Sequence, residues 1–320
     1  MPPGPGMVEY RAARRAGNSG YACPDTDWHA ANEVKRGPDD GFLHAYYETS
    51  PMKLSFIGLG VQGKYLAINL AQAGHDLMVY DLRPGPLAEL ASHGAKIAGN
   101  GREAGAHGEI ISICVLDDDQ LRTVVLGDQG VLAGAARGSI IAVHSTVEPA
   151  TIALLADAAA ARGVELLDAP VSGSEPGARN KTMAHMVGGS VAAFARCRPI
   201  FAVSGPNVIH TGPSGTGIRA KLAHQIMVCL NMLSAYEGMQ LGVAAGVSPE
   251  ILEQVVGAGS AQSRIGDRWS KRKLHAQARE VFYKDLRLCL KYAHDLKLPL
   301  PGAALAQQLL DRIVILADQP

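Results

Sequence analysis

The chain has 320 residues, of which 47% are hydrophobic and 19% are charged. This length and composition are typical of two ordinary folded domains, and they exclude a disordered or fibrous protein. Thirty basic side chains balance thirty acidic ones, so net charge favours neither nucleic acid nor an anionic membrane as a partner. No apolar run reaches the roughly 18–20 residues that a membrane helix needs, and we expect a soluble, cytoplasmic protein.

The cysteines indicate neither a metal site nor a disulfide framework. They are odd in number, widely spread and without a Cys-x-x-Cys pair. Reduced thiols in the cytoplasm are therefore the expected state. The five are Cys23, Cys114, Cys197, Cys229 and Cys289.

Residues 1–51 differ in composition and in hydrophobic periodicity from the rest of the chain. They begin Met-Pro-Pro-Gly-Pro-Gly, mix basic with acidic side chains and show no sustained periodicity. They contain no apolar core of a secretory signal. We expect either a disordered N-terminal extension or a start codon assigned too early, with Met52 as the true first residue.

From Lys53 onward, short strand-like segments alternate with helical ones. The strand-like segments are β-branched and bounded by Gly, Asp or Pro, and a last strand is expected at residues 208–211. They cover residues 54–57, 77–80, 110–116, 140–143 and 164–167, and amphipathic stretches cover residues 64–73, 86–92 and 149–162. This alternation predicts an α/β fold over residues 52–213, with a Rossmann-type, doubly wound parallel sheet and right-handed crossovers.

Residues 214–320 predict a second, all-helical domain. Residues 218–245 are apolar on most of a helical surface, which is typical of a helix buried between domains or subunits. Further helices are expected at residues 249–256, 281–296 and 303–317. We expect this domain to serve substrate binding and dimerisation.

A glycine-rich turn joins the first predicted strand to the first predicted helix. In a Gly-x-Gly-x-x-Gly turn the first glycine permits the tight turn, the second admits a pyrophosphate and the third allows close packing of helix and strand. The pyrophosphate then lies on the helix N-terminus. The strand before it and the helix after it favour a dinucleotide site over a simple turn. The turn residues are Gly58, Leu59, Gly60, Val61, Gln62 and Gly63.

Asp81 ends the second predicted strand, about 20 residues beyond the turn. Its carboxylate is suited to accept hydrogen bonds from the adenosine ribose and to repel a 2′-phosphate. This favours NAD over NADP, although Arg83, two residues later, would soften the repulsion. The alternative is that Asp81 caps the following helix.

From Met52 to about Pro301, the chain resembles the β-hydroxyacid dehydrogenases, the group of 3-hydroxyisobutyrate dehydrogenase and tartronate semialdehyde reductase, with a cofactor domain of the 6-phosphogluconate dehydrogenase type. The glycine turn and four later motifs match in order. The later motifs are Asp168-Ala169-Pro170-Val171-Ser172-Gly173, Met-Val-Gly-Gly at 186–189, Gly215-Thr216-Gly217 with Lys221, and Lys284-Asp285-Leu286. The resemblance implies a Rossmann domain, then a helical domain, with the active site between them.

The resemblance also implies roles for single residues. Ser172 and Gly173 hold the substrate carboxylate, and Lys221 is the catalytic acid/base. Three residues, Leu116, Thr146 and Lys284, are expected to contact the cofactor. The implied reaction is hydride transfer between NAD, with NADP possible, and a small hydroxy acid such as 3-hydroxyisobutyrate, glycerate or a sugar acid. A homodimer or homotetramer is expected.

General chemistry, apart from the family resemblance, also supports an acid/base role for Lys221. Oxidising an alcohol requires a base for the hydroxyl proton while hydride leaves, and a lysine in a partly dry cleft has a lowered pKa that suits this role. The alternative is a surface lysine on a long helix. Its apolar neighbours Ala220 and Leu222 make an exposed position less favourable.

Five positions depart from the family pattern. Ser174 and Lys181 stand where glycine is usual, and Gln62 replaces a methionine, with no effect that we assign. The Lys-x-x-Asn-Asn pattern becomes Lys221-Leu222-Ala223-His224-Gln225. Because Gln225 shares a helix face with Lys221, we expect it to help select the substrate, or else to hold Lys221 in place. His224 is either a second polar contact or a structural histidine.

Two other functions remain open at this stage. One is an imine or semialdehyde reductase on the same scaffold, and the other is a non-catalytic NAD-binding module. Imine reductases that resemble this family generally lack the lysine that stands here at position 221, and so does a non-catalytic relative, so Lys221 favours the dehydrogenase.

Overall fold

The computed structural model describes residues 51–271, 274–275 and 277–315, which all belong to one compact unit. The expected extension at residues 1–51 lies outside this range except for Pro51. The last residues of the predicted helical domain, 316–320, also lie outside it.

Within the described residues, nine strands form one sheet in the order β3-β2-β1-β4-β5-β6-β8-β7, with β9 beside β8. Neighbouring strands are parallel from β3 to β6, β8 is antiparallel to β6 and β7, and β9 is parallel to β8. This confirms the predicted Rossmann-type, mostly parallel sheet. The strands are β1 Lys53–Ile57, β2 Asp76–Tyr80, β3 Lys96–Ile97, β4 Ile110–Ile113, β5 Ile140–Val143, β6 Glu165–Asp168, β7 Val171–Ser172, β8 Ala184–Gly188 and β9 Asn207–Gly212.

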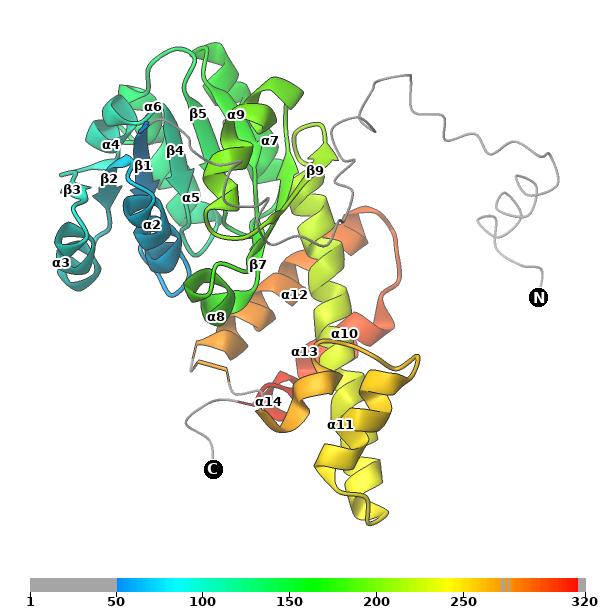
Figure 1. The fold of residues 1–320 in the computed structure, drawn as a ribbon. Coiled ribbons are helices and arrows are strands. Elements are labelled where there is room, and N and C mark those ends of the chain that lie inside the picture. The colour runs from blue at the N-terminus through cyan, green and yellow to red at the C-terminus, as the bar shows by residue number, and fades with distance from the viewer. Residues whose placement is uncertain (1–50, 272–273, 276, 316–320) are drawn as a thin grey trace. The chain divides into compact units, whose positions relative to one another are not determined.

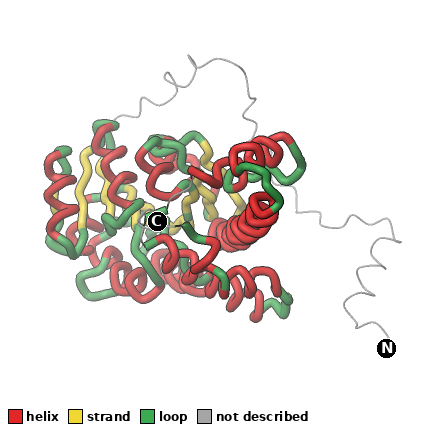
Figure 2. Tube along the Cα trace, turned by 90° about the horizontal axis from the view of Figure 1, so that it is seen from below, coloured by secondary structure: helices red, strands yellow, loops and turns green. Residues whose placement is uncertain are grey.

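Helices cover both faces of this sheet, and helices alone follow it (Figures 1 and 2). Those around the sheet are α2 Gly63–Gln72, α3 Pro84–Ser92, α4 Gly101–His107, α5 Asp118–Leu126, α6 Val131–Gly134, α7 Pro149–Ala161, α8 Ser174–Arg179 and α9 Val191–Ala202. Those after it are α10 Thr216–Ala244, α11 Pro249–Ala258, the 3-10 helix η1 Gly266–Lys271, α12 Ala278–Asp295, α13 Pro301–Gln308 and α14 Leu310–Ile313. Strand β9 ends at Gly212 and α10 begins at Thr216, so the predicted boundary between residues 213 and 214 lies in the loop between them.

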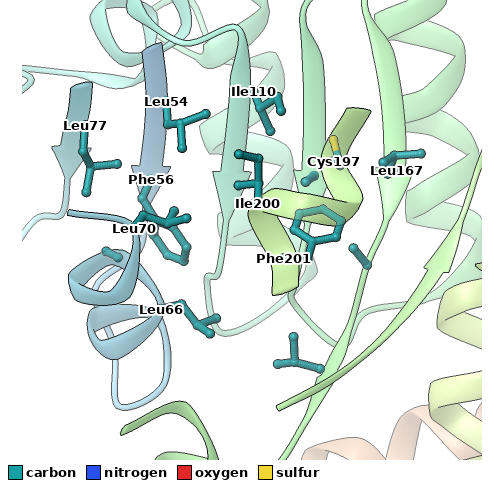
Figure 3. Packing of buried hydrophobic residues seen from close by; sticks show 14 of the residues in the cluster. Leu54, Phe56, Leu66, Leu70, Leu77, Ile110, Leu167, Cys197, Ile200 and Phe201 are labelled. Atoms are coloured by element: carbon teal, nitrogen blue, oxygen red, sulfur yellow. The ribbon is translucent and has the colours of Figure 1, made fainter. Parts of the chain in front are cut away.

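Two apolar cores lie on the two faces of the sheet because successive side chains of a strand point in opposite directions. In β5, Ile140 and Ala142 belong to one core, and Ile141 and Val143 belong to the other. Helices α2, α3, α8 and α9 contribute to the first core, and α4, α5, α6 and α7 to the second. Figure 3 shows part of the first core, in which β1 meets side chains of α2 and α9.

Helix α10 is the centre of the helical part. Helices α12, α13 and α14 pack on it around a third buried cluster, which includes Met232, Leu286 and Ile313. Among the described residues, none of the helices combines the length and the apolar character needed to cross a membrane.

Two sequence expectations about element bounds are wrong. The strand expected at residues 110–116 ends at Ile113, because the Val115 N–H bonds the Ser145 hydroxyl and the chain turns away from the sheet. The helix expected at residues 303–317 is broken at Leu309 into α13 and α14. The hydrophobic periodicity continues through this break, so the pattern alone does not reveal it. Strands β3, β7 and β8, helices α4, α5, α6, α8 and α9, and the 3-10 helix η1 were not predicted.

A pair of buried histidines lies in the first core, beside Phe201. His144 bonds the carbonyl of Ala169 at 2.9 Å and the hydroxyl of Ser112 at 3.1 Å. His185 stacks on Phe201 at 5.2 Å, and neither of its ring nitrogens has a partner among the described residues. Burial lowers the pKa of His144 to about 4 and holds the pKa of His185 well below its usual value. Both rings are therefore neutral in the folded protein at pH 7.

We predict that acid destabilises the fold through these two rings. The unfolded chain takes up a proton on each histidine near pH 6.5 and the folded protein does not, so stability is complete above that pH and falls as the pH drops. Between pH 7.5 and pH 5 each ring removes about 2 kcal/mol of unfolding free energy. His185→Phe keeps the aromatic contact and removes one proton site. Urea unfolding at the two pH values should show a drop smaller by about 2 kcal/mol in the variant. Equal drops in parent and variant would contradict this assignment.

Candidate active site

The glycine turn between β1 and α2 has a packed side and an open side. A Cβ on Gly58, whose φ is +89°, would lie 2.4 Å from the Cys114 carbonyl oxygen. A Cβ on Gly63 would lie 2.1 Å from the Gly58 oxygen, whereas one on Gly60 would meet no atom of the described residues within 4 Å. The open side at Gly60 and the amino end of α2 match the cradle that a dinucleotide pyrophosphate requires. These residues fit an NAD(P) cofactor.

Asp81 follows β2 and is bonded on both carboxylate oxygens. One oxygen accepts from the Leu59 N–H at 2.7 Å, and the other accepts from the Arg83 N–H at 2.8 Å. The Arg83 guanidinium adds two bonds of 3.0 Å, one to each oxygen. Burial raises the pKa of Asp81, but the bonds from Arg83 and Leu59 outweigh it and leave the pKa below its usual value. Since the carboxylate bonds the turn and Arg83, and α3 has no side-chain cap, the helix-capping alternative is not supported.

A cleft of about 2270 Å³ brings the predicted site residues together. Of the fourteen residues predicted for the site, all but Leu59 line it. Leu59 contributes its N–H to Asp81, and its side chain is only 1% exposed, within the first core. Leu116 is 56% exposed at the cleft.

Asp168, at the end of β6, fixes the start of α10. It is fully buried, and its two carboxylate oxygens accept the N–H groups of Gly215 at 2.7 Å and Ile218 at 2.8 Å. Burial raises the pKa of Asp168, and these bonds limit the rise. A Cβ on Gly217 would lie 2.4 Å from the Asp168 carbonyl oxygen, so only glycine permits this approach of helix and sheet. The motif that begins at Asp168 and the Gly215-Thr216-Gly217 motif are thus in direct contact.

Lys221 lies a little more than one turn into α10 and is 6% exposed. The surface alternative is therefore wrong. Burial lowers the pKa of Lys221 to about 8, Asp285 opposes this shift and Lys284 adds to it. A group with such a pKa both accepts and donates a proton near neutral pH.

A chain of polar contacts leads from Lys221 across the cleft. The Lys221 amine donates to the Gln225 amide oxygen at 2.9 Å, and the Gln225 nitrogen donates to Asp285 at 2.6 Å. Asp285 pairs with Lys284 at 3.0 Å, and the Lys284 amine donates to the Thr146 carbonyl at 2.6 Å. Sequence reasoning did not assign a role to Asp285, although the Lys-Asp-Leu motif contained the signal.

Ser172 ends β7 and faces α10. Its hydroxyl lies 3.2 Å from Nε2 of His224. Gly173 follows with a φ of +145°, and a Cβ there would lie 2.6 Å from the Met183 sulfur. At Ser174 and Lys181, where the family pattern has glycine, φ is +56° and +55°. The backbone thus keeps the left-handed conformation that glycine favours, at a cost on the order of 1–3 kcal/mol each.

Among the described residues, no cluster of three His, Cys, Asp or Glu side chains is arranged to hold a metal ion.

Two family models cover most of the chain. Residues 53–212 match the NAD binding domain of 6-phosphogluconate dehydrogenase, and residues 215–317 match a domain described as NAD-binding of NADP-dependent 3-hydroxyisobutyrate dehydrogenase. The junction of the two models falls between β9 and α10.

Individual relatives agree with these matches. The chain is 39% identical over 264 residues to 2-hydroxy-3-oxopropionate reductase of Escherichia coli (strain K12), across 81% of this chain and 90% of that protein. It is 32% identical over 266 residues to 2-(hydroxymethyl)glutarate dehydrogenase of Eubacterium barkeri, across 81% and 88% of the two chains. The crystal structure of a 3-hydroxyisobutyrate dehydrogenase from Salmonella typhimurium is similar with a TM-score of 0.71 and 30% identity, across 81% and 92%. With its Rossmann sheet, its helical part and its glycine turn, the chain belongs to the β-hydroxyacid dehydrogenase family and is an NAD(P)-dependent oxidoreductase.

Proposed function

We propose that this enzyme interconverts a small β-hydroxy acid and the corresponding oxo acid, with Lys221 as the acid/base. The substrate is of the 3-hydroxyisobutyrate, glycerate or sugar-acid type. The observation that carries the proposal is the buried amine of Lys221, with a pKa of about 8, in one cleft with Ser172 and the glycine turn. The retained lysine argues against the imine reductase and against the non-catalytic module.

Each polar group of the cleft then has a task in the reaction. Ser172 and the backbone of Gly173 bind the substrate carboxylate. In the oxidation, the neutral amine of Lys221 accepts the hydroxyl proton, and in the reduction the charged amine returns it. Bound NAD(P) supplies the hydride acceptor or donor. Lys284 and Thr146 join the cofactor-binding side of the cleft to Asp285, which in turn holds Gln225.

We also propose NAD as the preferred cofactor, because Asp81 follows β2 and lies beside the turn. Arg83 neutralises part of this effect, since it pairs with Asp81 and is 58% exposed at the cleft.

A homo-oligomer and a cytoplasmic location are further parts of the proposal. Large apolar side chains are exposed on α10 and α11, among them Leu241, Ile251 and Val255 at 75%, 49% and 63%, and such faces favour association of subunits. Cys114, Cys197 and Cys289 are free thiols, the state that a reducing compartment maintains.

Lys221→Ala should retain NAD binding and lose at least about 10²-fold in kcat, the usual scale of general acid–base catalysis. In the parent enzyme, kcat for oxidation should rise through pH 8 as the lysine loses its proton, and kcat for reduction should fall over the same range. Initial rates and fluorescence titration with NAD would measure both. Lys291→Ala, a control at a surface pair with Glu148, should leave kcat unchanged. Near-parental turnover in Lys221→Ala would remove the proposed acid/base.

Cofactor preference should move in opposite directions in two variants. Asp81→Asn leaves Arg83 without its partner charge, so the ratio of kcat/KM for NADP to that for NAD should rise about tenfold or more, equivalent to roughly 1.4 kcal/mol. Arg83→Ala should lower that ratio. A parent enzyme with the higher kcat/KM for NADP would refute the proposed preference, whatever the variants show.

Gln225→Asn tests the two readings of Gln225. The amide contacts Lys221 and Asp285, which supports positioning of the lysine over direct contact with the substrate. A side chain one carbon shorter does not span both partners, so kcat/KM should fall by roughly tenfold and by the same factor for 3-hydroxyisobutyrate, glycerate and a sugar acid. Losses that differ between these acids would instead support substrate selection by Gln225.

A further inference from the structure

His224 lies between two groups of the proposed site, at a position where the family pattern has asparagine. Its Nε2 is 3.2 Å from the Ser172 hydroxyl, and its Nδ1 is 3.2 Å from the amide oxygen of Gln225. The ring is half-buried and lines the cleft. An asparagine here would not titrate, whereas an imidazole does.

The contacts of Gln225 determine where the proton of the neutral ring lies. At pH 7 Lys221, with its pKa of about 8, is mostly the charged ammonium, which can only donate and therefore requires the amide oxygen. The Asp285 carboxylate requires the amide N–H. The amide orientation is therefore set, and the atom that faces Nδ1 of His224 is an acceptor. It follows that Nδ1 carries the hydrogen of a neutral imidazole and that Nε2 presents a lone pair.

This tautomer makes Ser172 a poor anchor for a carboxylate. The Ser172 O–H donates its hydrogen to the lone pair on Nε2. The hydroxyl oxygen then presents only lone pairs to a substrate, and these repel a carboxylate. A protonated His224 reverses the bond, because Nε2–H then donates to the Ser172 oxygen. The Ser172 hydrogen is then free to bond the substrate carboxylate, and the charged imidazolium is hydrogen-bonded to the same hydroxyl.

We propose that the substrate carboxylate binds together with one proton, taken up by His224, which turns the Ser172 hydroxyl from the imidazole toward the substrate. This inference rests on the proposed function, since it requires Ser172 to hold the carboxylate. His224 thereby makes substrate affinity depend on pH separately from the proton transfer at Lys221.

The charges of the cleft support this linkage. Burial and then the charge of Lys221 lower the pKa of His224, so the ring is neutral at pH 7 before substrate binds. The bound carboxylate adds a negative charge beside Ser172, which favours the imidazolium. Two pairs of described charged groups also line the cleft, Lys284 with Asp285 on α12 and Glu175 with Arg179 on α8.

Isobutyrate is a suitable probe, because it carries the carboxylate without a hydroxyl and binds without turnover. With NAD bound, its affinity for the enzyme should fall by up to tenfold per pH unit between the pKa of His224 in the free enzyme and its higher pKa in the complex. In enzyme labelled with ¹³C-histidine, the pKa of His224 should rise by about one unit or more when isobutyrate is saturating. The His224 signal is identified as the one missing from His224→Asn or His224→Gln.

His224→Asn is also the matched control, because it restores the family residue. Its affinity for isobutyrate should be independent of pH between 5.5 and 7.5, while kcat for a hydroxy acid keeps its step near pH 8 from Lys221. If isobutyrate binds but leaves the pKa of His224 unchanged or lowers it, the role proposed for His224 is overturned and the proposed function is not. The same holds if His224→Asn keeps the parental pH dependence of affinity. If isobutyrate does not bind and no hydroxy acid is oxidised, the proposed function fails together with this inference.

Discussion

The carboxylate of Asp168 joins the sheet to the helical part, and the geometry of the site depends on it. Its negative charge is buried at the amino end of α10, where two backbone N–H groups and the helix dipole compensate it. A hydrogen bond to a charged group is worth about 1.5–3 kcal/mol, and loss of this carboxylate would leave buried N–H groups without partners. Ser172 lies four residues after Asp168, and Lys221 lies three residues after Ile218, whose N–H bonds the Asp168 carboxylate. One buried charge thus sets both the proposed carboxylate anchor and the proposed base.

A second constraint connects the chemistry to the cofactor side of the cleft. Lys221, Gln225, Asp285 and Lys284 form a continuous polar chain that ends on the backbone of Thr146. Burial favours the neutral amine of Lys221, and Asp285 opposes it through one intervening amide. With the charge of Lys284, which adds to the lowering, this balance leaves the pKa of Lys221 at about 8. The helical part therefore contributes the electrostatics of the site as well as a wall of the cleft.

The departures from the family pattern acquire different meanings in the structure. Ser174 and Lys181 keep a backbone conformation that glycine adopts without strain, so the loop shape is retained although the residues changed. His224 changes the hydrogen bonding of Ser172 and introduces a titratable group. Gln225 keeps its amide and uses it within the protein. His224 thus gives the site a titratable group where the pattern has an asparagine.

Local signals in the sequence determined the parts of the molecule that depend on neighbouring residues. The period of the strands, the glycine turn and the residues Asp81, Ser172, Lys221 and Lys284 were all identified from pattern and resemblance, because these features need particular residue types at fixed spacing. Strands β3 and β7 were not identified, since each has only two residues and carries no periodicity. Strand β8 was recognised only through the Met-Val-Gly-Gly motif and not as a strand.

Only the tertiary structure decided how distant segments meet. Asp168 and Gly217 are far apart in the chain, and nothing in either motif states that a carboxylate of one caps the helix that begins at the other. Asp285 acquires its role because α12 packs against α10, and the bond between Ser172 and His224 exists because β7 faces the same helix. A hydrogen bond depends on distances of a few tenths of an ångström, and sequence spacing defines such distances only within a single helix or turn.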